Sequence, residues 1–276
     1  MPKPSDPVGV DGLPLAAEPR VPFYWTALVF VLSLALFALT SSPAPVPGES
    51  ARWLLQVVGL DPLPSLSHPL WIALAKVVAA LPFGTLVHRI NLLSAVCGAL
   101  SVALIFLTTA CLRHDKTFEE SSLRRLPAGH GLVSGLVAAL VLATSVTFWV
   151  VSNRAHPATL GICLALLAFR LFHRFEYRPD HWRLALSAFC WGLACTEVPG
   201  CVLASPLYLV AVLLAMVRKG VWRWKFAAAI GGALVLGGRD LLRDRVDRHE
   251  AGAAIRQGDA GPVALPPGDA DGLPGV

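Results

Sequence analysis

The chain has 276 residues, of which 55% are hydrophobic and 15% are charged. Soluble domains carry about 25% charged residues, so this composition excludes an ordinary water-soluble surface and indicates a protein whose solvent is the lipid bilayer. The net charge of +5 does not indicate a nucleic-acid partner, because Lys and Arg occur in short clusters between apolar runs and form no stripe with interleaved aromatic residues.

The six cysteines lie within apolar stretches and form no C-x-x-C pair. Their spacing predicts neither a zinc site nor a disulfide framework. We interpret them as small apolar packing residues, and no metal ligand is predicted from sequence spacing.

Long apolar runs predict a membrane domain over residues 22–238. Residues 1–21 are rich in Pro, Gly and acidic residues, which predicts a disordered tail, and residues 239–276 form a polar, low-complexity tail. Residues 226–238 are a short candidate for a seventh span. Six runs are predicted to cross the bilayer: 22–40, 91–112, 131–151, 157–169, and the two halves of 184–217, a stretch too long for one span that divides at Glu197-Val198-Pro199-Gly200.

Charge bias decides whether the apolar segment 68–83, which contains Lys76, also crosses the membrane. If it crossed, the basic clusters in 113–125 and 170–183 would face outward, contrary to the positive-inside rule. If it lies in the interface, both clusters and a third in 218–225 face the cytoplasm together with the N-terminus. We therefore prefer the interfacial position.

The predicted fold is thus an all-α, polytopic integral membrane protein with six to seven transmembrane helices. A long external loop, residues 41–90, follows the first span. It is expected to carry an amphipathic helix over 49–60 and an interfacial helix over 69–81.

In this topology the notable polar residues meet at the outer face. The first external loop carries Glu49, His68 and Arg89, the second carries Arg154, and the third carries Glu197. A carboxylate and several basic groups around a cleft at membrane level suit chemistry on a lipid-linked phosphate. The alternative is that interfacial loops are polar without any chemical role.

Several motifs resemble, in their order and spacing, the N-terminal module of the GT-C glycosyltransferases, and most of all the bacterial protein O-mannosyltransferase-like group. Phe148-Trp149 and Gly192-Leu193-Ala194 fall where that group has its Phe-Trp and Gly-Leu motifs, and the resemblance covers residues 24–214. The motifs of the first loop are Pro47-Gly48-Glu49-Ser50-Ala51, His68-Pro69-Leu70-Trp71, Leu81-Pro82-Phe83-Gly84 and Arg89-Ile90-Asn91-Leu92-Leu93-Ser94-Ala95.

The resemblance implies a catalytic first external loop and a polyprenyl-phosphate sugar as donor substrate. Glu49 stands where the family usually has Asp, which implies a general base that takes the proton of the acceptor hydroxyl. The alternative is an ordinary acidic residue at a helix N-terminus. Whether a divalent metal takes part stays open.

The basic residues are assigned to the phosphate of the lipid carrier. A guanidinium at Arg89 holds phosphate oxygens through two parallel bonds, although a residue at this depth also snorkels to lipid headgroups. Arg154 is a second candidate for the same role. His68 is a candidate to orient a phosphate or ligate a metal, or else simply begins a helix beside Pro69.

Two departures from the family pattern bear on activity. His156-Pro157 stands where the family commonly has an acidic residue followed by Val-Tyr, and Thr196-Glu197-Val198 stands where it has Asn-His. Glu197 is a candidate to supply the missing carboxylate from a neighbouring loop. The family's chains also usually continue into further spans.

The resulting prediction is a transferase that moves a sugar from a polyprenyl-phosphate carrier to an unidentified acceptor. Its expected location is the outer face of a bacterial inner membrane, with a cytoplasmic N-terminus. The alternative is a truncated or degenerate, non-catalytic homologue that acts as a lipid-binding or assembly partner. A transporter ranks third, because the predicted spans contain few polar residues.

Overall fold

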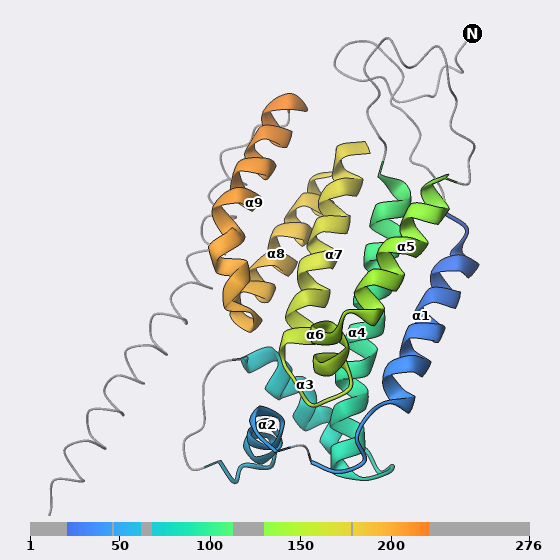
Figure 1. The fold of residues 1–276 in the computed structure, drawn as a ribbon. Coiled ribbons are helices and arrows are strands. Elements are labelled where there is room, and N and C mark those ends of the chain that lie inside the picture. Colours follow the sequence, from blue (N-terminus) through green and yellow to red (C-terminus); the bar gives the residue numbers. More distant parts are fainter. Residues whose placement is uncertain (1–20, 46, 62–67, 113–129, 178, 221–276) are drawn as a thin grey trace, which may run out of the picture.

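The structure, a computed structural model, describes residues 21–45, 47–61, 68–112, 130–177 and 179–220. Every regular element in these residues is an α-helix, which confirms the predicted all-α class (Figure 1). In chain order the helices are α1 (Phe23–Leu39), α2 (Glu49–Val58), α3 (Pro69–Ala79), α4 (Leu86–Cys111), α5 (His130–Thr144), α6 (Val146–Ser152), α7 (Ala158–Tyr177), α8 (His181–Glu197) and α9 (Pro199–Arg218).

Helix α4 lies at the centre of the bundle. It packs against α1, α5 and α7, and α7 packs in turn against α8. Helices α1, α4, α5, α7, α8 and α9 run side by side, whereas α2, α3 and α6 gather at one end of the bundle, which we call the loop end (Figure 1). The loop end therefore holds the short helices between which a site can form.

Three helices are long and apolar enough to cross a membrane by length and composition: α4, α7 and α9. The pair α5 and α6 makes a fourth when it is counted as one bent span. The 17 residues of α1 are apolar but shorter. These helices indicate a membrane protein, and the larger count of six to seven spans stays a prediction.

The run 131–151, predicted as one span, is a bent pair of helices. Helix α5 ends at Thr144, and α6 turns away by 68° after Ser145. Ser145 has an extended ψ of 120° and stands among β-branched neighbours, which are weak helix formers. The bend carries α6 across the loop end and brings residues 150–156 toward α2.

The two helices predicted in the first loop are both present, as α2 and α3. Helix α3 has 11 residues and is about 16 Å long at 1.5 Å per residue, which is too short for a bilayer core of about 30 Å. Helix α2 buries Ser50, Leu54 and Val57, one stripe at helical spacing, next to Trp71 of α3. Their position at the membrane interface stays a prediction.

The predicted break near the middle of 184–217 is confirmed. Helix α8 ends at Glu197, Val198 is extended, and α9 begins at Pro199, whose missing N–H costs nothing at the first helical position. Both helix ends at this turn lie at the loop end of the bundle (Figure 1).

Arginines of α7, α8 and α9 lie at the opposite end of the bundle, although Arg52, Lys76 and Arg89 lie at the loop end. Arg174 lies in the last turn of α7, Arg183 in the first turn of α8, and Arg218 in the last turn of α9. These helix ends lie away from α2 and α3 (Figure 1), and the orientation expected from charge bias stays a prediction. The predicted tails, the segment 226–238 and the cluster in 113–125 lie outside the described residues.

Glycine allows α4 and α5 to pack closely. Gly131 and Gly135 are four residues apart on α5, the spacing of small residues that lets membrane helices approach. A Cβ atom at Gly135 would lie 2.9 Å from the carbonyl oxygen of Phe106 and 2.9 Å from the Cβ of Ala110. The backbone of α4 thus occupies the space that a side chain would need.

We expect Gly135→Ala to lower the free energy of unfolding by about 1–3 kcal/mol, because the added methyl group forces α4 and α5 apart. Gly200→Ala is the matched control, since its Cβ meets nothing closer than 3.8 Å. Thermal unfolding of both variants in detergent micelles measures the difference. Equal melting temperatures for the two variants would contradict the close packing.

Candidate functional site

A polar pocket of about 270 Å³ opens at the loop end, between the start of α2 and the segment that joins α6 to α7. Glu49, Arg154 and His156 provide its charged and titratable side chains. The remaining lining residues are Pro47, Ser50, Val150 and Val151. One carboxylate, one guanidinium and one imidazole therefore share a single pocket.

Local geometry places Glu49 at the rim of the polar pocket. Gly48 precedes it with φ 102°, a conformation that favours glycine, and α2 begins at Glu49 itself. The Glu49 side chain is 81% exposed, and its Oε2 lies 3.3 Å from Nε2 of His156. One carboxylate oxygen is thus held against the protein while the group as a whole faces the pocket.

The contacts of His156 fix which ring nitrogen carries the proton. Nδ1 accepts a hydrogen bond from the backbone N–H of Ala158 at 3.1 Å, so the hydrogen of the neutral ring is on Nε2, which donates to Glu49. Burial lowers the pKa of His156, and this outweighs the neighbouring Glu49 carboxylate, which raises it. The imidazole therefore acts as a neutral donor.

Arg154 is the cation of the polar pocket. It is half-buried, and among the described residues no carboxylate forms an ion pair with it. A guanidinium whose donors are not committed to a carboxylate remains available to an anionic group in the pocket.

Arg89 lies elsewhere, at the C-terminal end of α3. Its guanidinium donates to the carbonyl oxygen of Ala79 at 2.7 Å and also to that of Leu81. A helix leaves its last carbonyls without internal partners, and a cation there interacts favourably with the helix dipole. In this structure Arg89 holds the end of α3.

Glu197 lies at the other end of α3, buried to 1% exposure in the turn between α8 and α9. Its Oε1 accepts hydrogen bonds from the backbone N–H groups of Leu70 at 2.9 Å and Trp71 at 3.3 Å. These are the unpaired donors of the first turn of α3, so a carboxylate from a residue 127 positions later caps the helix.

His68 sits beside this cap. Its Nδ1 lies 3.7 Å from Oε2 of Glu197, and its ring packs edge-on against Trp53 with centroids 4.9 Å apart. Its φ of 64° is unusual for a residue with a side chain, and more so before a proline. Packing against α2 and the α8–α9 turn holds this conformation.

The structure thus brings two of the five predicted site residues, Glu49 and Arg154, into the polar pocket. Arg89, His68 and Glu197 surround α3. Sequence reasoning missed His156 as a partner of Glu49. The available signal was the His156-Pro157 pair, whose departure from the family pattern marked the position without indicating its contact.

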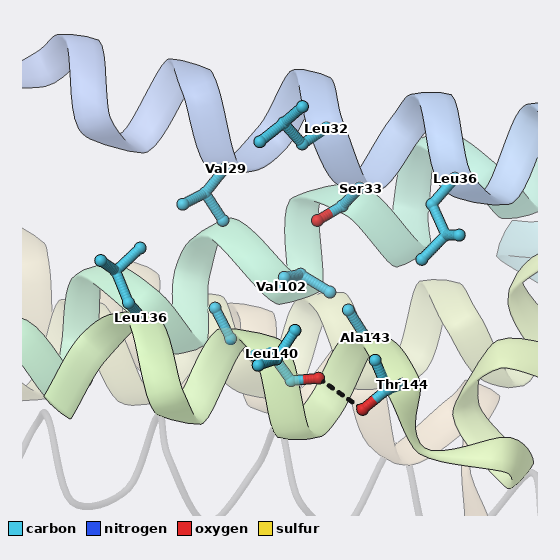
Figure 2. Close-up of a pocket in the computed structure, with 10 residues that line it drawn as sticks. Val29, Leu32, Ser33, Leu36, Val102, Leu136, Leu140, Ala143 and Thr144 are labelled. Carbon is cyan, nitrogen blue, oxygen red and sulfur yellow. Dashed lines mark hydrogen bonds between the residues drawn. The ribbon is translucent and has the colours of Figure 1, made fainter. Parts of the chain in front are cut away.

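A second pocket, of about 320 Å³, lies between α1, α4 and α5 and is lined almost entirely by aliphatic side chains (Figure 2). Its polar groups are the hydroxyls of Ser33 and Thr144, and the latter donates to the carbonyl of Leu140. None of its lining residues is ionisable, in contrast to those of the polar pocket.

The described helices indicate an all-helical membrane protein that has a polar pocket between short helices at one end. Residues 67–222 match the family model described as the protein O-mannosyl-transferase TMEM260 N-terminal domain. The match covers more than half of the chain, which therefore belongs to this O-mannosyltransferase-like family. It includes Arg154, His156 and all the residues around α3, whereas Glu49 precedes it. No solved structure matches the chain.

We expect the Glu197 cap to make stability depend on pH. Burial raises the pKa of Glu197 from 4.5 to about 7, although hydrogen bonds from Trp71 and Leu70 lower it. Between about pH 4.5 and 7 the folded protein thus retains a proton that the unfolded chain has lost. The stabilisation that results from this raised pKa is complete below about pH 4.5 and is lost as the pH rises through 7. Glu197→Gln, which does not titrate, should show a flatter dependence of melting temperature on pH.

Glu197→Ala separates the capping role from the charge. It leaves two buried N–H groups without an acceptor, so at every pH it should be less stable than Glu197→Gln by about 1–3 kcal/mol. The imidazole of His68 faces the same carboxylate, so the series is repeated in a His68→Gln background. Identical pH profiles for the native protein and Glu197→Gln would rule out the titrating cap.

Proposed function

We propose that the protein is a glycosyltransferase that moves a sugar from a polyprenyl-phosphate carrier to an acceptor hydroxyl in the polar pocket. The observation that carries the proposal is the convergence of Glu49, Arg154 and His156 on that pocket. Membership of an O-mannosyltransferase-like family supports mannose as the sugar and a protein hydroxyl as the acceptor.

Glu49 acts as the general base in this proposal. The hydroxyl proton of the acceptor moves to the carboxylate as the hydroxyl oxygen bonds to the anomeric carbon. The bond between that carbon and the phosphate oxygen breaks, and the carrier phosphate leaves with the electron pair, so the configuration inverts. Attack and departure on opposite faces require the base and the phosphate to lie on opposite sides of the sugar.

Arg154 receives the departing phosphate. Its guanidinium matches two phosphate oxygens and stabilises the charge that develops as the bond breaks. The pocket of about 270 Å³ lies just below the range of about 300–1,000 Å³ that is usual for small-molecule sites, so it suits one sugar better than a lipid chain. The lipid carrier then extends from the pocket along the bundle into the membrane.

We place the site at the outer face of a bacterial inner membrane, with the N-terminus in the cytoplasm. The arginine-bearing helix ends opposite the loop end support this orientation. Membrane lipids are the surrounding partners.

One set of contacts favours a second candidate, a non-catalytic homologue that binds lipids or assists assembly. Arg89 and Glu197, both candidates for chemistry, hold the two ends of α3. In that case the polar pocket retains an anionic lipid headgroup but transfers nothing. The two candidates differ in whether Glu49 is needed for turnover.

Glu49→Gln should lower kcat about 10²–10⁴-fold in proteoliposomes that contain polyprenyl-phosphate-linked labelled mannose and a Ser/Thr peptide, because the amide cannot take the acceptor proton. The matched control is Glu176→Gln, a carboxylate on α7 toward the opposite end of the bundle. Full activity in Glu49→Gln would remove the proposed base. Donor binding without turnover in the native protein would favour the non-catalytic homologue.

Arg154→Gln should raise KM for the lipid donor roughly 10–100-fold, since a charge-assisted hydrogen bond contributes about 1.5–3 kcal/mol. Lys76→Gln removes an exposed cation on α3 outside the pocket and should leave KM unchanged. Initial rates over a range of donor concentrations measure both. Similar KM values for the two variants would argue for general surface charge and against a phosphate site.

A further inference from the structure

The exposed side chain of Glu49 needs a partner that orients its carboxylate in the polar pocket. The side chain of Glu49, the base proposed above, is 81% exposed, and Glu49 is the first residue of a ten-residue helix. An exposed Glu populates several rotamers, most of which would point its carboxylate away from a bound sugar. Something must select the productive rotamer.

We propose that His156 is a positioning residue that holds Glu49 in the orientation needed to accept the proton. This inference rests on the proposed function. Nε2 of His156 donates to Oε2 of Glu49 at 3.3 Å, which leaves Oε1 as the oxygen that faces the acceptor. His156 itself neither binds substrate nor takes a proton in this scheme.

The tautomer of His156 determines that its ring donates a hydrogen bond to Glu49. Because Nδ1 is occupied as an acceptor by the N–H of Ala158 at 3.1 Å, the ring offers its only hydrogen to Glu49. Protonation of Nδ1 would break the bond to Ala158. The groups that face the imidazole in the pocket are Glu49 and Arg154, and burial keeps the ring neutral against the attraction of the carboxylate.

The backbone of His156 is fixed to two long helices. Its N–H donates to Oγ of Ser94 on α4 at 3.2 Å, and its carbonyl oxygen accepts from Oγ1 of Thr159 on α7 at 3.0 Å. Both hydroxyls are fully buried. The hydroxyl of Ser94 also lies 3.4 Å from that carbonyl. A mobile carboxylate is thereby tied through one imidazole to the rigid centre of the bundle.

His156→Leu and His156→Gln test the role by turnover. In the proteoliposome assay, His156→Leu should lower kcat roughly 10–100-fold with less than a twofold change in KM for the donor, because orientation is lost while binding remains. His156→Gln keeps an N–H donor and should recover most of the rate. In a Glu49→Gln background, His156→Leu should cause no further loss. His88→Leu, an exposed histidine on α4, is the control.

The outcomes separate the two proposals. A fully active His156→Leu beside an inactive Glu49→Gln overturns the positioning role and leaves the proposed function standing. An active Glu49→Gln overturns both. Melting temperatures of the variants in detergent distinguish loss of orientation from loss of fold.

A measurement without turnover tests the geometry directly. ¹⁵N NMR of imidazole-labelled protein in micelles, with the His156 signal assigned by its absence in His156→Gln, should show Nε2 protonated and Nδ1 unprotonated at pH 7. The Nε2 signal should shift in Glu49→Ala and not in Glu176→Gln. A proton on Nδ1, or an Nε2 signal that is insensitive to Glu49→Ala, overturns the inference.

Discussion

Helix α3 is held at its two ends by a carboxyl group and a guanidinium from distant parts of the chain, and the loop end of the molecule depends on this. The carboxylate of Glu197 accepts the free N–H groups at its start, and the guanidinium of Arg89 donates to the carbonyls at its end. The positive charge of Arg89 at the end of α3 also has the sign that the helix dipole favours. A helix of 11 residues gains little stability from its own hydrogen bonds, so these contacts and its packing fix its position.

The anchored helix sets the position of α2, and thus of Glu49. Trp71 of α3 is completely buried in a cluster with Leu54 and Val57 of α2, and Trp53 of α2 packs edge-on against both Trp71 and His68. Gly161 allows α7 to approach the turn between α8 and α9 closely, since a Cβ atom at Gly161 would lie 3.1 Å from the Cβ of Glu197 and closer still to the side chain of Val198. These contacts therefore connect α7, through the α8–α9 turn and α3, to α2 and so to the rim of the polar pocket.

The sequence was informative where one physical rule decides. The length of the apolar runs predicted the long helices, and charge bias led to the short helix α3. The length of 184–217 and its proline predicted the break after Glu197, because both act locally in the sequence. The bend after Ser145 was not predicted, since the composition of 131–151 satisfies an uninterrupted span. The contacts of Glu197 with α3 and of His156 with Glu49 join residues 126 and 107 positions apart. No local pattern encodes such pairs, and the family resemblance indicated the positions without the partners.

The two carboxylates at the loop end differ in environment, and this difference supports different roles for them in the proposed transferase. Glu197 is 1% exposed, accepts two backbone hydrogen bonds and has a pKa raised to about 7 by burial. A group so enclosed cannot reach an acceptor hydroxyl without breaking the cap on α3, so it suits structure. Glu49 is open to the pocket and keeps one oxygen uncommitted to His156. The proposed base, Glu49, is thus the carboxylate that the fold leaves exposed, and the buried carboxyl group of Glu197 holds the start of α3.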